Sequence, residues 1–167
     1  MKYSGKTYAV ADLHGNLAIW NEIEKFLKPE DKIYVLGDCG DRGTESWRTI
    51  KAVAANPQAI YLKGNHEDML VKAVKEFRLY DTYGDKCNLL FANGGFNTLE
   101  GWLMDGAKDS WIRHLDKLPL TATYVNKDNI EFLLSHAGFS PNKSINNHDL
   151  GHVLLKSSCP NRVRNTH

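Results

Sequence analysis

Residues 33–43, Ile-Tyr-Val-Leu-Gly-Asp-Cys-Gly-Asp-Arg-Gly, decide the fold of this chain. The first four are apolar and rich in β-branched and aromatic side chains, which is typical of a buried strand, and a polar turn follows at once. A strand of an open α/β sheet delivers side chains in this way to a crevice at its carboxyl end. There the carboxylate of Asp38 could bridge two metal ions, and the planar guanidinium of Arg42 suits phosphate oxygens.

The same succession of strand, polar cluster and helix occurs twice more. Residues 7–11 run into Asp12-Leu13-His14 before a helical pattern that ends at Pro29. Residues 59–62 run into Gly64-Asn65-His66-Glu67 before another helical pattern. Three such alternations predict parallel strands joined by right-handed crossovers.

The pattern changes after the third unit. Residues 81–116 are punctuated by glycine and rich in aromatic side chains, and they predict a helical insertion. Two short runs, 120–125 and 130–134, predict a β-hairpin whose second strand delivers His136. Residues 142–167 lose this periodicity and are expected to be loose. We therefore expect one domain over 1–167, an α/β fold with a layered sheet of mixed strands flanked by helices.

The composition argues against several classes of function. The 21 basic and 20 acidic residues leave a formal charge of +1, so nothing predicts binding to nucleic acid or a membrane surface. No run approaches the roughly 18 apolar residues that cross a bilayer, and no apolar signal core follows the N-terminus, so a cytoplasmic location is expected. A monomer is the default, and the oligomeric state is left open.

The three cysteines are not spaced like a disulfide framework or a zinc site. Cys39, Cys87 and Cys159 are odd in number and unpaired in spacing, so we expect free thiols. Cys39 lies inside the second polar cluster. Oxidative sensitivity of that cluster is therefore a hypothesis.

The metal-ligating residue types are spread over four clusters. Asp12 and His14 offer one hard oxygen and one imidazole on the same side of the chain, which suits Mn, Fe or Zn better than Ca. The amide oxygen of Asn65 can ligate a metal without adding charge, although a simple helix cap is an alternative. His136, in Ser135-His136-Ala137-Gly138, has small neighbours that let a metal and a substrate come near. With Asp38, these residues predict a site for two metal ions that cleaves phosphoesters.

Two further residues are suited to proton transfer. His66 follows Asn65 directly and can protonate a departing alkoxide, and Asp41 can orient its imidazole. Glu67 is interpreted as a first-turn helix carboxylate favoured by the helix dipole.

In this order, the four clusters resemble those of the calcineurin-like metallophosphoesterases, and specifically of the lambda-phage type of bacterial and phage serine/threonine protein phosphatases. Asn93-Gly94-Gly95 with Thr98 is also similar to that subgroup. The resemblance covers about residues 6–140. It implies a catalytic water activated by two divalent ions, for which Mn is expected and Fe or Zn are alternatives, with no phosphoenzyme intermediate.

The resemblance also implies a role for each site residue. It implies these assignments: Asp12 and His14 on the first metal, Asp38 bridging, Asn65 and His136 on the second, His66 and Asp41 as the acid pair, and Arg42 with Asn65 on the substrate phosphate. The expected substrates are proteins phosphorylated on serine or threonine, with phosphotyrosine as an extension. Symmetrical diadenosine tetraphosphate is the alternative substrate, because that branch shares the same motifs.

The C-terminal part departs from the family pattern. A Trp-x-Arg segment and a Gly-His-Thr segment normally follow Ser-His-Ala-Gly, and neither is present in recognisable form. Gly151-His152 matches the first two residues of the Gly-His-Thr segment but lacks the threonine, which makes His152 a weak further ligand candidate. We therefore expect the chain to be truncated and to lack the final strands of the family. A catalytically weak or inactive metal-binding remnant is a third functional alternative.

Overall fold

The computed structural model describes residues 5–138. The segment expected to be loose, 142–167, lies outside these described residues, and so do His152 and Cys159. Chain contacts divide the molecule into two units, Met1–His136 and Ala137–His167, and all elements below belong to the first. Among the described residues, no helix is both long and apolar enough to cross a bilayer. The single-domain organisation stays a prediction.

A parallel three-stranded sheet forms the centre of the first unit. Its strands are β1 (Thr7–Val10), β2 (Lys32–Val35) and β3 (Ala59–Tyr61), in the order β1-β2-β3. The register pairs Val10 with Val35 and Val35 with Tyr61. The parallel pairing predicted from the three strand and helix alternations is confirmed.

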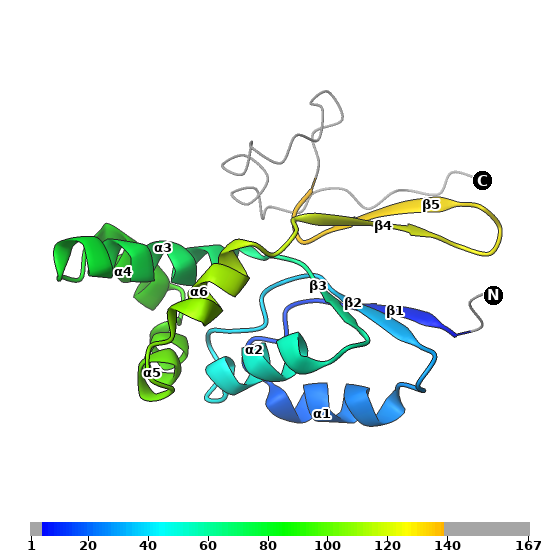
Figure 1. Ribbon diagram of the computed structural model, residues 1–167, viewed down its shortest axis with the longest axis horizontal. Coiled ribbons are helices and arrows are strands. Elements are labelled where there is room, and N and C mark those ends of the chain that lie inside the picture. The colour runs from blue at the N-terminus through cyan, green and yellow to red at the C-terminus, as the bar shows by residue number, and fades with distance from the viewer. Residues whose placement is uncertain (1–4, 139–167) are drawn as a thin grey trace, which may run out of the picture. The chain divides into compact units, whose positions relative to one another are not determined.

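Two helices cover one face of this sheet, α1 (Leu17–Phe26) and α2 (Ser46–Ala55), as Figure 1 shows. Trp20 of α1 and Ile50 of α2 are almost completely buried in the core with Val35. β2 is central and its last three residues are all buried, which explains its uninterrupted apolar run. Continuous apolar patterning is typical of a strand covered on both faces.

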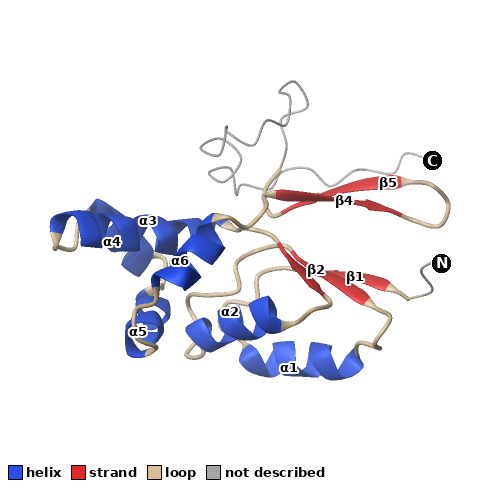
Figure 2. Cartoon of the chain, in the orientation of Figure 1, coloured by secondary structure: helices blue, strands red, loops and turns tan. Residues whose placement is uncertain are grey.

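Four helices follow β3: α3 (Asn65–Tyr80), α4 (Asp85–Ala92), α5 (Phe96–Met104) and α6 (Asp109–Asp116). Figure 2 shows this part of the chain as helices and short loops only. The helical insertion expected around 81–116 is therefore present as α4, α5 and α6. Helix α4 buries only Cys87 and Leu90.

A β-hairpin follows α6. β4 (Thr121–Val125) and β5 (Glu131–Ser135) pair antiparallel and form a separate two-stranded sheet. The side chain of Asn126 accepts the backbone N–H groups of Asp128 and Ile130, which fixes the turn. The ring of Tyr124 lies 6.2 Å from that of Tyr34 in β2, centroid to centroid. The predicted hairpin is confirmed, and β5 ends directly before His136.

Candidate metal centre

The first two polar clusters are joined along their backbones beyond the strand ends. His14 N donates to Asp38 O at 3.0 Å, and Gly15 N donates to Cys39 O at 2.8 Å. Asp12 N donates to Gly37 O at 3.2 Å. These bonds continue the pairing of β1 with β2 into the loops, so both clusters face the same edge of the sheet.

Several residues in these two loops adopt a left-handed backbone. Five of the eight described non-glycine residues with positive φ lie here: Asp12, His14, Asp38, Asp41 and Arg42, with φ between 43° and 67°. Such conformations are uncommon outside glycine and persist only where surrounding structure holds them. Their clustering marks this edge of the sheet as a site under functional constraint. The identities of the residues did not reveal these backbone conformations.

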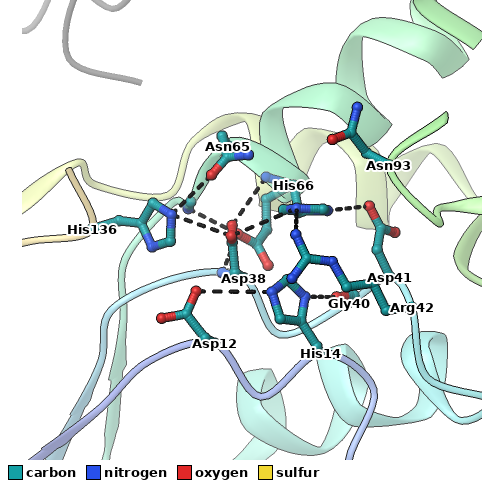
Figure 3. A network of polar contacts seen from close by, with 12 residues as sticks. Asp12, His14, Asp38, Gly40, Asp41, Arg42, Asn65, His66, Asn93 and His136 are labelled. Atoms are coloured by element: carbon teal, nitrogen blue, oxygen red, sulfur yellow. Dashed lines mark hydrogen bonds and ion pairs between the residues drawn. The ribbon is translucent and has the colours of Figure 1, made fainter. Parts of the chain in front are cut away.

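Two groups of potential metal ligands share Asp38 (Figure 3). One joins Asp38 with Asp12 and His136, and the other joins it with His14 and His66. Within each group the ligand atoms lie within 4.8 Å of one another. A carboxylate common to two ligand groups is the arrangement that a pair of bridged cations requires. These groups differ from the expected assignment, which places Asp12 and His14 on one ion and keeps His66 for proton transfer. The ligand roles stay predictions, but the donor set fits divalent ions.

His136 is oriented by contacts from two directions. Its Nδ1 lies 2.7 Å from Leu36 O, so Nδ1 carries the hydrogen and Nε2 faces the centre. Nε2 lies 3.2 Å from Asp38 Oδ2 and 2.9 Å from Asn65 Oδ1. The hydrogen bond to Asp38 raises the pKa of His136 to about 9, against the opposing effect of burial. Two oxygens and one nitrogen therefore converge on a position that a cation would suit.

Asp38 keeps the charge that a metal ligand needs. Burial pushes the pKa of its carboxyl upward, but hydrogen bonds from His136 and from the backbone N–H of His66 outweigh burial and lower it. The N–H of His66 lies 3.0 Å from Asp38 Oδ1. The carboxylate is thus ionised at neutral pH although only 3% of the residue is exposed.

The residues predicted for proton transfer and phosphate binding lie beside this centre. His66 Nδ1 lies 2.6 Å from Asp41 Oδ2, and both side chains are buried. The Arg42 guanidinium lies 3.3 Å from His66 Nε2 and can only donate, which assigns the ring hydrogen to Nδ1. Arg42 itself is exposed at the rim, where a substrate phosphate could reach it.

Glu67 has a larger structural role than the sequence indicated. It lies in the first turn of α3, as interpreted, but only 1% of it is exposed. Its carboxylate accepts the backbone N–H groups of Asp38, Cys39 and Gly64 at 2.8 to 2.9 Å and the Tyr61 hydroxyl at 2.7 Å. Glu67 therefore ties the second cluster to the third. Glu67 follows Gly64 by three residues, which is the spacing of a capping box. This spacing is the feature of the sequence that could have indicated the role of Glu67.

Comparisons with known proteins identify the family of the chain. A family model described as calcineurin-like phosphoesterase matches residues 5–161. A symmetrical bis(5'-nucleosyl)-tetraphosphatase of Haemophilus influenzae (strain ATCC 51907 / DSM 11121 / KW20 / Rd) is 30% identical over 141 residues, which cover 81% of this chain and 45% of that protein. The protein of that name from Histophilus somni (strain 2336) is 31% identical over 144 residues, with the same coverage.

A solved structure supports the same fold. The crystal structure of a proposed diadenosine tetraphosphatase superposes with a TM-score of 0.60 at 18% identity, over 91% of this chain and 63% of that chain. The chain spans less than half the length of the two curated relatives above. Because the family model matches nearly all of it and the four clusters meet around Asp38, the chain belongs to the calcineurin-like phosphoesterase family.

Proposed function

We propose that this chain hydrolyses phosphoester or phosphoanhydride bonds with two divalent ions held around Asp38. The observation that carries the proposal is the pair of ligand groups that share this buried carboxylate. The ions, when bound, would supply Lewis-acid activation of a water molecule and neutralise charge on the phosphoryl oxygens. Mn is the expected metal, and Fe or Zn would also suit a set of aspartate, histidine and asparagine ligands.

The residues of the chain have distinct tasks in this proposal. Arg42, exposed at the rim, binds the substrate phosphate together with the amide of Asn65. His66 protonates the leaving oxygen, and Asp41 holds its imidazole through the 2.6 Å contact at Nδ1. His14, Asp12 and His136 hold metal with Asp38. His152, which lies outside the described residues, stays a further candidate ligand.

Symmetrical dinucleoside tetraphosphates are the first substrate class to test. The two curated relatives compared above carry that activity in their names and match 81% of this chain. A second class is supported by the contacts of residues 94–98, which belong to the segment that resembles the lambda-phage type of protein phosphatase. Gly94 O accepts Arg42 N at 2.7 Å, and Thr98 Oγ1 accepts Asp41 N at 2.9 Å. Phosphoproteins are therefore the second candidate substrates.

One experiment separates these candidates. The purified chain, supplied with Mn, is assayed on diadenosine tetraphosphate, a phosphoserine peptide and 4-nitrophenyl phosphate, with metal content measured in parallel. Asp38→Asn should lower every measurable turnover at least about 100-fold, because it removes the negative charge and one of the two oxygens of the shared ligand. Asp31→Asn is the matched control, since Asp31 is also a buried aspartate but accepts the backbone N–H groups of Lys6 and Lys28, away from the ligand groups.

The outcomes have different meanings. Faster turnover of the dinucleotide favours the first class, and faster turnover of the peptide favours the second. Folded protein that binds metal without hydrolysing any of the three substrates would contradict the proposal and support the metal-binding alternative.

A further inference from the structure

A short segment of the helical insertion contacts the loop that carries the acid and phosphate residues. Gly94 O accepts the backbone N–H of Arg42 at 2.7 Å. The side-chain amide of Asn97 donates to Gly43 O at 3.2 Å. The start of α5 is thus hydrogen-bonded to residues 41–43, far away in the sequence, so the insertion is part of the site's architecture.

Thr98 makes the most specific of these contacts. Its hydroxyl accepts the backbone N–H of Asp41 at 2.9 Å and donates a hydrogen bond to Asp41 Oδ1. Thr98 is 1% exposed, so water does not compete for these bonds. A Cβ on Gly40 would lie 3.3 Å from both Cγ2 and Oγ1 of Thr98, which shows how closely α5 approaches this loop.

The hydroxyl determines which carboxylate oxygen faces the histidine. Because Oδ1 of Asp41 is bound to Thr98, Oδ2 remains to accept from His66 Nδ1, at 2.6 Å. The opposite ring nitrogen, Nε2, then points toward the Arg42 guanidinium at the rim. Thr98, Asp41 and His66 thus form one chain of hydrogen bonds. Figure 3 shows its last part, in which the His66 ring lies between Asp41 and the Arg42 guanidinium.

We propose that Thr98 is a positioning residue that orients His66, through Asp41, for proton donation to the leaving group. This inference rests on the proposed hydrolytic function. In the assisted step a bond forms between the water oxygen and phosphorus while the bond from phosphorus to the leaving oxygen breaks. The leaving oxygen keeps the electron pair and takes the proton that the imidazolium form of His66 carries on Nε2 once Arg42 has turned from that nitrogen to the substrate phosphate. The water releases a proton to solvent.

Leaving-group dependence distinguishes positioning from a general structural role. Phenyl phosphate has a poor leaving group and needs the proton, whereas 4-nitrophenyl phosphate needs it much less. Thr98→Val should lower kcat about 10- to 100-fold on phenyl phosphate but less than about 3-fold on 4-nitrophenyl phosphate, because general acids contribute chiefly where the leaving group is basic. Thr98→Ser keeps the hydroxyl and should restore most of the loss.

Thr49→Val is the matched control. Thr49 is also buried, but its hydroxyl donates to Glu45 O within the first turn of α2. This variant removes a buried hydroxyl and should leave the ratio of the two rates unchanged. Equal losses on both substrates in Thr98→Val, or no loss on either, would overturn the proposal.

A measurement without substrate keeps the inference separate from the proposed function. In nitrogen-15 NMR spectra, the His66 Nδ1 proton should be protected from exchange in wild type, Thr98→Ser and Thr49→Val. In Thr98→Val it should exchange rapidly, because the Asp41 carboxylate is free to turn. If the wild type hydrolyses neither aryl phosphate, nor diadenosine tetraphosphate, nor the phosphoserine peptide, the proposed function fails, while this resonance still decides the role of Thr98. Unchanged protection of the Nδ1 proton in folded Thr98→Val would refute the positioning role of Thr98.

Discussion

Glu67 Oε2 accepts the backbone N–H of Asp38 at 2.9 Å, and this bond fixes the residue shared by both ligand groups from the first turn of α3. Glu67→Gln replaces one carboxylate oxygen by an amide that faces two donors. We expect a loss of about 3 kcal/mol in unfolding free energy, because buried donors lose their acceptor. Metal affinity should also fall by about 10- to 100-fold, as for other residues that orient ligands. Urea unfolding and metal titration measure the two effects.

Glu76→Gln provides the control for this prediction. Glu76 is a half-buried carboxylate that accepts the backbone N–H groups of Lys86 and Cys87 at the start of α4. Its variant should cost about 1 kcal/mol, typical of a helix cap, and leave the metal affinity unchanged. Equal metal affinity in Glu67→Gln and wild type would show that the loop does not depend on this carboxylate.

The shared position of Asp38 predicts an unequal effect of ligand removal. Asp38→Ala should lower the affinity for both ions, because both ligand groups lose a member. Asn65→Ala should weaken only one, because Asn65 Oδ1 lies beside His136 at one end of the centre. Metal analysis after desalting should find close to no ion in the first variant and one in the second. Two ions retained by Asp38→Ala would contradict a bridging carboxylate.

The sequence predicted the strands because their apolar runs end abruptly in polar clusters. β2 is the clearest case, since Ile33 and Val35 are buried and Asp38 follows within one turn. The meeting of the clusters could also be predicted, because parallel strands end at one edge of a sheet. His136 lies at this edge only if the hairpin returns to it. The position of His136 directly after β5 implies that return.

Other features carried too weak a signal. A glutamate in the first turn of a helix has the same pattern whether it is exposed or, like Glu67, buried under four donors. Ile19 and Phe26 of α1 are apolar and lie seven residues apart, on one side of the helix, yet they are 50% and 65% exposed, because periodicity does not tell how far a partner surface extends. The link from Thr98 to Asp41 depends on tertiary packing across residues distant in the sequence, which no local pattern records.

Acid should destabilise the fold partly through Asp31. Backbone hydrogen bonds from Lys28 N and then Lys6 N lower the pKa of this carboxyl below its ordinary value. Its stabilising effect is therefore complete above the unfolded-state pKa and is lost as the pH falls through the lower folded-state pKa. Unfolding free energies measured in chelator between about pH 6 and pH 3 should decline less steeply in Asp31→Asn than in wild type.

The cause of this pH dependence can be tested separately. Lys28→Ala removes the ammonium but keeps the backbone N–H that is the largest contribution at Asp31. Its acid profile should therefore stay close to that of wild type. A profile as shallow as that of Asp31→Asn would assign the effect to the charge of Lys28 instead.

The structure argues against oxidation of Cys39 as a control on the site. The thiol is completely buried, and burial together with the nearby Glu67 raises its pKa well above the ordinary value. Almost no thiolate is then present at neutral pH, and only the thiolate reacts readily with peroxide or alkylating reagents. Alkylation mapped by mass spectrometry should find Cys39 unmodified in the folded protein and fully modified in urea. Turnover should be unchanged after mild peroxide. The oxidation hypothesis would be restored if peroxide lowered turnover, a thiol reversed this loss, and the Cys39→Ser variant did not show the loss.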